Sequence, residues 1–213
     1  VMLLPGYPGI MRITSATQFE MGGNFLIRSR RDWLGPDTLV VAVDAPSDEW
    51  CCFTSGFRAG NRYAEDLRGL RAEIEKRYGA LPFHIIGTSE GSVSAYYAAR
   101  ALQREGDRVV FTASLFLSSR NAVGLATMDM KAVTVPALLV HHADDPCSYT
   151  PYTAAKSMAQ RTGYPLITVR HANAGSGPAC NAQTPHGFIG VESETVSAID
   201  AWLRGEHEAD VTK

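Results

Sequence analysis

The stretch from Phe83 to Arg100 constrains the fold most, because it holds a strand pattern, a tight turn and a helix pattern in direct succession. The apolar run 83–86 is followed by Gly-Thr-Ser-Glu-Gly and then by a segment rich in small, helix-forming residues. Gly87 and Gly91 flank Ser89 at two positions where a Cβ would collide with a neighbouring strand or helix if the turn is sharp. The pattern therefore predicts a turn that holds the Ser89 hydroxyl clear of a sheet.

The rest of the chain repeats this alternation of buried strands and helices. Strand-like apolar runs that do not alternate with polar residues fall at 1–4, 38–43, 83–86, 109–117, 136–142 and 165–171. Helix patterns fall within 11–33, at 63–78, from the serine turn to about 104, at 154–161 and up to 203. Continuous apolar strands separated by helices predict an α/β protein, a doubly wound and mostly parallel sheet of about six strands in three αβα layers.

Length, charge and hydropathy bound the class of protein. A chain of 213 residues is most simply one domain, which we place at 1–205, followed by a polar tail at 206–213 that we expect to be frayed. The formal net charge of -2 and the lack of a Lys/Arg block argue against nucleic acid or an anionic membrane as partner. No apolar run approaches the roughly 20 residues of a transmembrane helix. Val1 already lies in a strand-like run, so we interpret the chain as a trimmed or mature form.

Groups that could activate the Ser89 hydroxyl occur in two later loops. A serine needs a base to take its proton and an acid to orient that base. The fifth apolar run ends in His-His-Ala-Asp-Asp, which offers Asp144 and Asp145, and the sixth is followed by the loop that holds His186. Both loops belong at the carboxyl edge of a parallel sheet, where the serine turn also lies. The order Ser, Asp, His along the chain predicts a catalytic triad.

These motifs resemble the α/β-hydrolase superfamily, in particular its small lidless carboxylesterases and dienelactone-hydrolase-like enzymes. The resemblance extends from Val1 to about Leu203 and rests on the serine turn and on His-Gly-Phe at 186–188. In that family the acid commonly lies three residues after a glycine that ends the strand. Here His142 stands in the place of that glycine. The resemblance therefore implies Asp145 as the acid, with Asp144 as the alternative. The short segment 118–135 leaves no room for a lid domain.

The same resemblance implies an oxyanion hole made of two backbone N–H groups. One belongs to Glu90, the residue after the serine, and the other to Tyr7 in Pro-Gly-Tyr-Pro, which resembles the family's His-Gly-aromatic-Pro turn. Pro5 stands where many relatives have His. The two strands that usually precede this turn are also absent, so the chain is either a minimal version of the sheet or one that has lost residues.

The function implied is hydrolysis of a small-molecule or polymeric carboxylic ester by a serine hydrolase, with no cofactor and no metal. A peptidase or thioesterase on the same fold, or a non-catalytic binding protein, are the alternatives. The pair His141 and His142 with the following aspartates suggests a metal site less well, because neighbouring strand residues point to opposite faces. The pattern predicts neither the chain length of the substrate nor the oligomeric state.

Four cysteines complete the set of candidate residues. If both loops converge on Ser89, Cys147 and Cys180 come close enough for a disulfide, which would indicate a periplasmic or secreted protein; two free thiols would indicate a cytoplasmic one. We expect thiols at Cys51 and Cys52.

Three further polar positions carry structural predictions. We expect His84 and His171 to be hydrogen-bonded at strand ends, and Asp44 to cap a loop rather than contact substrate. The Glu90 side chain is either solvated or anchors a neighbouring loop.

Overall fold

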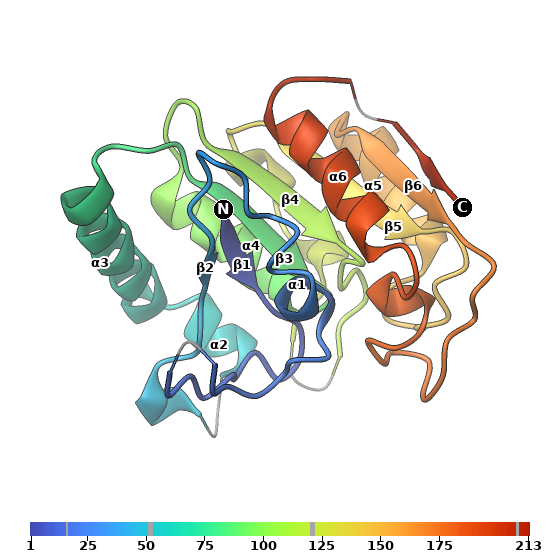
Figure 1. Ribbon diagram of the computed structural model, residues 1–213, viewed down its shortest axis with the longest axis horizontal. Coiled ribbons are helices and arrows are strands. Elements are labelled where there is room, and N and C mark those ends of the chain that lie inside the picture. The colour runs from blue at the N-terminus through green and yellow to red at the C-terminus, as the bar shows by residue number, and fades with distance from the viewer. Residues whose placement is uncertain (16, 51–52, 120–121, 208) are drawn as a thin grey trace.

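A computed structural model describes residues 1–15, 17–50, 53–119, 122–207 and 209–213. Over these ranges, one sheet of seven strands, all parallel, has the order β2-β1-β3-β4-β5-β6-β7 (Figure 1). The strands are β1 (Met2–Leu4), β2 (Val41–Ala42), β3 (His84–Thr88), β4 (Arg108–Thr112), β5 (Ala137–His142), β6 (Leu166–Arg170) and β7 (Val211–Thr212). The predicted α/β class is confirmed.

Helices cover both faces of the sheet (Figure 1). Apolar side chains of α3, α4 and α5 pack on one face, and those of α1 and α6 pack on the other. The α-helices are α1 (Phe25–Arg28), α2 (Ser55–Arg58), α3 (Asn61–Tyr78), α4 (Gly91–Leu102), α5 (Tyr152–Thr162) and α6 (Glu192–Leu203). Short 3-10 turns are η1 (Ser47–Glu49), η2 (Leu125–Thr127), η3 (Met130–Ala132) and η4 (Pro185–Gly187).

Three of the predicted elements are shorter than expected. The strand predicted at 38–43 is the two-residue β2. Within 11–33 the only α-helix in the described residues is the four-residue α1, which begins after the glycine pair 22–23 with Asn24 as its N-cap. The fourth strand ends at Thr112 instead of 117, because Ala113 has a φ of +40° and turns the chain out of the sheet. Between β4 and β5 the described residues form only η2 and η3, so no lid is present there.

The prediction of a frayed tail is wrong. Residues 211–212 form β7, which pairs with β6 and makes the sheet one strand wider than predicted. Asp210 accepts a hydrogen bond from the Thr168 N–H at 2.7 Å, and the Lys213 ammonium lies 2.6 Å from Glu194. A two-residue strand is too short for apolar periodicity to reveal.

The two glycines of the serine turn meet the steric prediction. A Cβ at Gly87 would lie 2.2 Å from the Gly91 carbonyl oxygen, and one at Gly91 would lie 2.1 Å from the Leu4 carbonyl oxygen. The first contact is with α4 and the second with the end of β1, so the turn depends on both glycines.

Asp44 holds the segment after β1 in place, as the capping prediction states. Its carboxylate accepts from the backbone N–H groups of Met11 at 2.6 Å, Ile13 at 2.9 Å and Ala45 at 2.8 Å.

None of the helices in the described ranges combines the length and the hydropathy needed to cross a bilayer.

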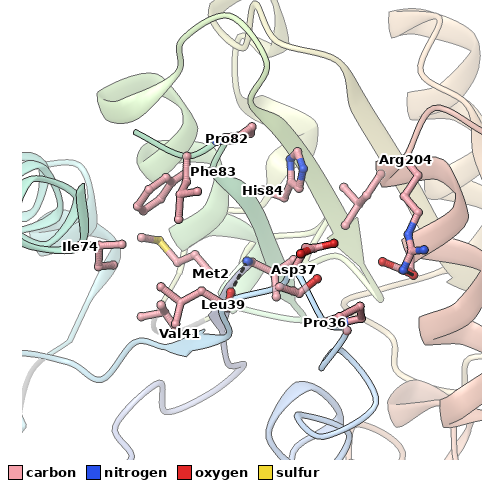
Figure 2. A pocket seen from close by; sticks show the side chains of 16 residues that line it. Met2, Pro36, Asp37, Leu39, Val41, Ile74, Pro82, Phe83, His84 and Arg204 are labelled. Atoms are coloured by element: carbon pink, nitrogen blue, oxygen red, sulfur yellow. Dashed lines mark hydrogen bonds and ion pairs between the residues drawn. The ribbon is translucent and has the colours of Figure 1, made fainter. Parts of the chain in front are cut away.

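A pocket of about 400 Å³ lies beside the first residues of β1 and β3, at the edge of the sheet opposite Ser89. Figure 2 shows Met2, Val41, Ile74 and Phe83 on one side of it and Arg204 on the other. His84 also lines it, and among the described residues its Nδ1 has no hydrogen-bond partner, so the expectation for this histidine is wrong. Burial lowers the pKa of His84 to about 4.

The expectation for His171 is met. Its Nδ1 lies 3.2 Å from the Lys213 carbonyl oxygen, at the end of the strand pair β6 and β7.

Candidate active site

Ser89 stands at the turn between β3 and α4 with a φ of +53°, a strained conformation for a residue with a Cβ. Its N–H donates to the Thr112 carbonyl oxygen at 3.0 Å. Its own carbonyl accepts from the Ser92 hydroxyl at 2.6 Å and from the Leu115 N–H at 3.2 Å. These contacts tie the turn to β4 and to the first turn of α4, which fixes the direction of the Ser89 side chain.

His186 lies in η4, and its Nε2 is 3.0 Å from Ser89 Oγ. Thr184 caps this turn by accepting from the His186 N–H at 3.2 Å. Gly187 has no room for a side chain, because a Cβ there would lie 2.0 Å from the Ala182 carbonyl oxygen. The Gly of His-Gly-Phe therefore allows the loop to fold closely behind the histidine.

Asp145, and not Asp144, reaches the histidine. Its Oδ2 lies 2.9 Å from His186 Nδ1 and accepts from the Thr150 hydroxyl at 2.8 Å. Its Oδ1 accepts from the Cys147 N–H at 2.9 Å. Burial alone would raise the pKa of Asp145, but hydrogen bonds from His141 and His186 hold it well below its usual range. Asp144 is exposed to solvent.

Ser89 and His186 line a pocket of about 700 Å³ at the carboxyl edge of the sheet, whereas the Asp145 side chain is fully buried and does not line it. The turn after β1 borders it closely, since a Cβ at Gly6 would lie 3.0 Å from Ser89 Cβ. Tyr7 and Glu90 both line the pocket. Among the described residues, no hydrogen bond is recorded from the backbone N–H of Tyr7 or of Glu90, so both remain able to serve a bound oxygen.

The Glu90 side chain is not solvated, and it anchors the short helix α2, whereas the sequence predicted either solvation or the anchoring of a loop. It accepts from Arg58 Nη1 at 2.8 Å, and Arg58 also donates through Nε to the Ser94 hydroxyl at 2.8 Å. The Arg58 side chain is 0% exposed and that of Glu90 is 6% exposed. Burial raises the pKa of Glu90 and lowers that of Arg58, so each ion depends on the other for compensation.

Replacing Arg58 by Met should lower the free energy of unfolding at pH 7 by about 3–5 kcal/mol, because it leaves the Glu90 carboxylate buried and unpaired. The double variant Arg58→Met/Glu90→Gln should recover most of that loss. A raised carboxyl pKa means that the folded state prefers the protonated form, so the loss in Arg58→Met should shrink as the pH falls from 7 to 5. Urea unfolding at both pH values measures this. A double variant less stable than the single variant would contradict it.

A disulfide joins the acid loop to the histidine loop, as predicted. Cys147 and Cys180 are bonded, with their Cα atoms 4.5 Å apart and a sequence separation of 33. Cys147 is buried, whereas Cys180 is exposed at the pocket. The prediction for Cys51 and Cys52 lies outside the described residues.

Removing this bridge should lower the free energy of unfolding by about 3.7 kcal/mol, the chain-entropy value for a loop of 33 residues. Urea unfolding of the wild type with a phosphine reductant and of the variant Cys147→Ser/Cys180→Ser should give the same reduced stability. If the two proteins have the same stability, the loss comes from this bridge and not from a change at Cys51 or Cys52. A double variant as stable as the oxidised wild type would contradict the prediction.

Sequence reasoning missed Arg28, a residue of α1 that holds the histidine loop. Its guanidinium donates to the carbonyl oxygens of Gly187 and, at 2.9 Å, of Ala182, on either side of His186. It also pairs with Glu192 at 2.8 Å, at the start of α6. Its position after Phe-Leu-Ile in a short helix suggests an ordinary surface arginine, and no spacing in the sequence links it to residue 187.

Comparison with known proteins adds a likeness of structure. A protein of Pectobacterium atrosepticum SCRI1043, provisionally named a YdeN-like hydrolase, matches this chain with a TM-score of 0.56. The match covers 95% of this chain and 90% of the other, with 18% identical residues. The two chains share a fold. No family model matches the sequence, and no curated protein is significantly similar to it. The likeness agrees with the predicted hydrolase fold and leaves the esterase subtype a prediction.

Proposed function

We propose that this protein is a serine hydrolase that cleaves carboxylic esters through an acyl-enzyme intermediate. The observation that carries the proposal is an unbroken chain of contacts at an open pocket. Ser89 Oγ lies 3.0 Å from His186 Nε2, and His186 Nδ1 lies 2.9 Å from Asp145 Oδ2. The structural neighbour's name as a hydrolase supports the same class of reaction.

The contacts assign a role to each group. Asp145 is ionised and accepts the Nδ1 proton of His186, which leaves the Nε2 lone pair facing the Ser89 hydroxyl. His186 takes the hydroxyl proton while Ser89 Oγ bonds to the ester carbonyl carbon. The same imidazolium then protonates the departing alkoxide, and a water molecule, activated by His186, releases the acid from Ser89.

The oxyanion that forms at each step has two proposed donors, the backbone N–H groups of Tyr7 and Glu90. Both line the pocket beside Ser89. Donors that are fixed before the reaction stabilise the developing charge without reorganisation, and losing one typically costs about 2.7–4 kcal/mol of barrier. The Arg58–Glu90 ion pair holds the Glu90 residue in place and thereby fixes one donor.

Exposed aromatic side chains border the pocket and leave the acyl preference open. Tyr7 is 64% exposed and Tyr149 is 43% exposed, and both line the entrance. An open, lidless pocket accepts either a small ester or the end of a polymer. The disulfide beside the pocket supports a periplasmic or secreted location for the enzyme.

The test of this proposal is a panel of p-nitrophenyl esters of graded acyl length, run beside matched p-nitroanilides and thioesters. We expect turnover of esters, with a rapid first release of p-nitrophenol equal to the enzyme concentration where deacylation is slow. Faster cleavage of anilides or thioesters would move the activity to a peptidase or a thioesterase. A folded protein without turnover on the whole panel would contradict the proposal and favour a binding protein.

A further inference from the structure

A second imidazole reaches the carboxylate of the proposed triad. His141, in β5, places its Nε2 3.2 Å from Asp145 Oδ2 and 2.7 Å from the Thr150 carbonyl oxygen. Its side chain is 1% exposed, and its ring centroid lies 5.6 Å from that of Phe116 and 6.2 Å from that of Tyr152. No step of the proposed reaction uses this histidine.

The partners of His141 decide which ring nitrogen carries a proton. A carbonyl oxygen and a carboxylate oxygen only accept hydrogen bonds, so Nε2 must be the protonated atom. Asp145 Oδ2 thus lies within 3.2 Å of three donor atoms, His186 Nδ1, the Thr150 hydroxyl oxygen and His141 Nε2, while Oδ1 accepts from a backbone N–H. The single Nε2 proton of His141 is shared with the nearer Thr150 carbonyl oxygen, at 2.7 Å. Such a number of donors on one buried carboxylate exceeds what the orientation of His186 alone requires.

We propose that His141 is a positioning residue that donates to Asp145, holds the carboxylate in line with His186 and weakens its attraction for the His186 imidazolium. This inference rests on the proposed function. A carboxylate whose charge is shared among more donors attracts each of them less, so losing His141 strengthens the Asp145–His186 pairing. His186 would then keep its proton to a higher pH and serve as a weaker acid toward the leaving group.

The other titratable groups around His141 stay unchanged in the test. His142 is its neighbour on β5, and burial lowers the pKa of His142. His142 Nδ1 accepts from the Asp144 N–H at 3.1 Å. Tyr152 faces His141 from α5, while Asp145 and His186 face it from their loops.

The variants His141→Phe and His141→Gln separate the donor from the ring. Phe keeps the contacts with the neighbouring rings and removes the donor, whereas the Gln amide can restore an N–H near the position of Nε2. In His141→Phe we expect the acidic midpoint of kcat/KM against pH to rise by about 0.5–1 unit and kcat to fall about tenfold. In His141→Gln both should return close to the wild-type values.

Histidine NMR titration of His186 in the same variants gives a readout that needs no turnover. We expect the same upward shift of its midpoint in His141→Phe, in a protein as folded as the wild type. If His141→Phe does not fold, His141→Asn replaces it, because the shorter amide does not reach Asp145. An unchanged midpoint in the donor-free variant, or an equal shift in His141→Gln, would overturn the proposal. Absence of ester turnover in the wild type would instead contradict the proposed function, and the NMR shift would still decide the role of His141.

Discussion

Replacing Ser89 by Ala should lower kcat for ester hydrolysis by about 10⁶-fold. The reason is that no other described hydroxyl lies within hydrogen-bond distance of His186 Nε2, so no acyl-enzyme can form. Steady-state kinetics on the best ester of the panel measures the loss, and far-UV circular dichroism checks the fold.

Ser157→Ala is the matched control for this variant. Ser157 lies exposed on α5, outside the pocket, and its replacement should leave kcat and KM unchanged. A Ser89→Ala enzyme that retains a tenth or more of the wild-type kcat would contradict the assigned nucleophile and would point to hydrolysis by a directly attacking water.

Replacing Asp145 by Asn should lower kcat by about 10⁴-fold, because an amide in this position favours the wrong tautomer of His186. The Asn side chain has nearly the same shape. The Cys147 N–H can hold its oxygen at the place of Oδ1, so that its N–H₂ replaces Oδ2 and faces the imidazole. His186 Nε2 would then carry the proton and could not accept one from Ser89. Measured kcat against pH, with the fold checked as before, gives the result.

Asp144→Asn offers a control one residue away. Asp144 is exposed, and its change should leave kcat within about threefold of the wild type, as for surface substitutions away from the reacting groups. Equal losses in the two variants would show that the acid had been assigned wrongly, since Asp144 was the alternative that the sequence left open.

The sequence could predict those parts of the site that local rules define. The glycines at 87 and 91 and the strained φ of Ser89 are requirements of one tight turn, so the residues themselves reveal it. The His186 turn is likewise local, since its Gly187 is needed for a close approach to Ala182. The acid required the additional rule of strand-end spacing, which favoured Asp145 over Asp144, and the contact with His186 agrees with that choice.

Two of the residues that the sequence did not reveal, Arg28 and Arg58, act across long separations. Arg28 contacts a carbonyl 159 residues further along the chain, and Arg58 reaches Glu90 over 32 residues. Neither pairing leaves a periodic signal. The packing of α1 against the His186 loop and of α2 against the serine turn creates both contacts. A helix of four residues such as α1 has too few apolar positions to reveal which face it buries.

His141 illustrates a different limit. A buried histidine at the end of a strand has no sequence feature that separates a structural from a functional role. Only the distances of 2.7 Å to the Thr150 carbonyl oxygen and 3.2 Å to Asp145 Oδ2 show that its Nε2 is protonated and lies beside the carboxylate of the proposed triad. Its role therefore had to be inferred from geometry and awaits the paired His141→Phe and His141→Gln measurements.

The most direct test of the central claim is labelling with a fluorophosphonate, which reacts with an activated serine and releases fluoride. Intact-mass spectrometry should show one adduct per chain, and peptide mapping should place it on Ser89. The adduct should be absent from Ser89→Ala and formed far more slowly in His186→Ala. A folded wild-type protein that takes no label, or that takes it on another residue, would contradict the account.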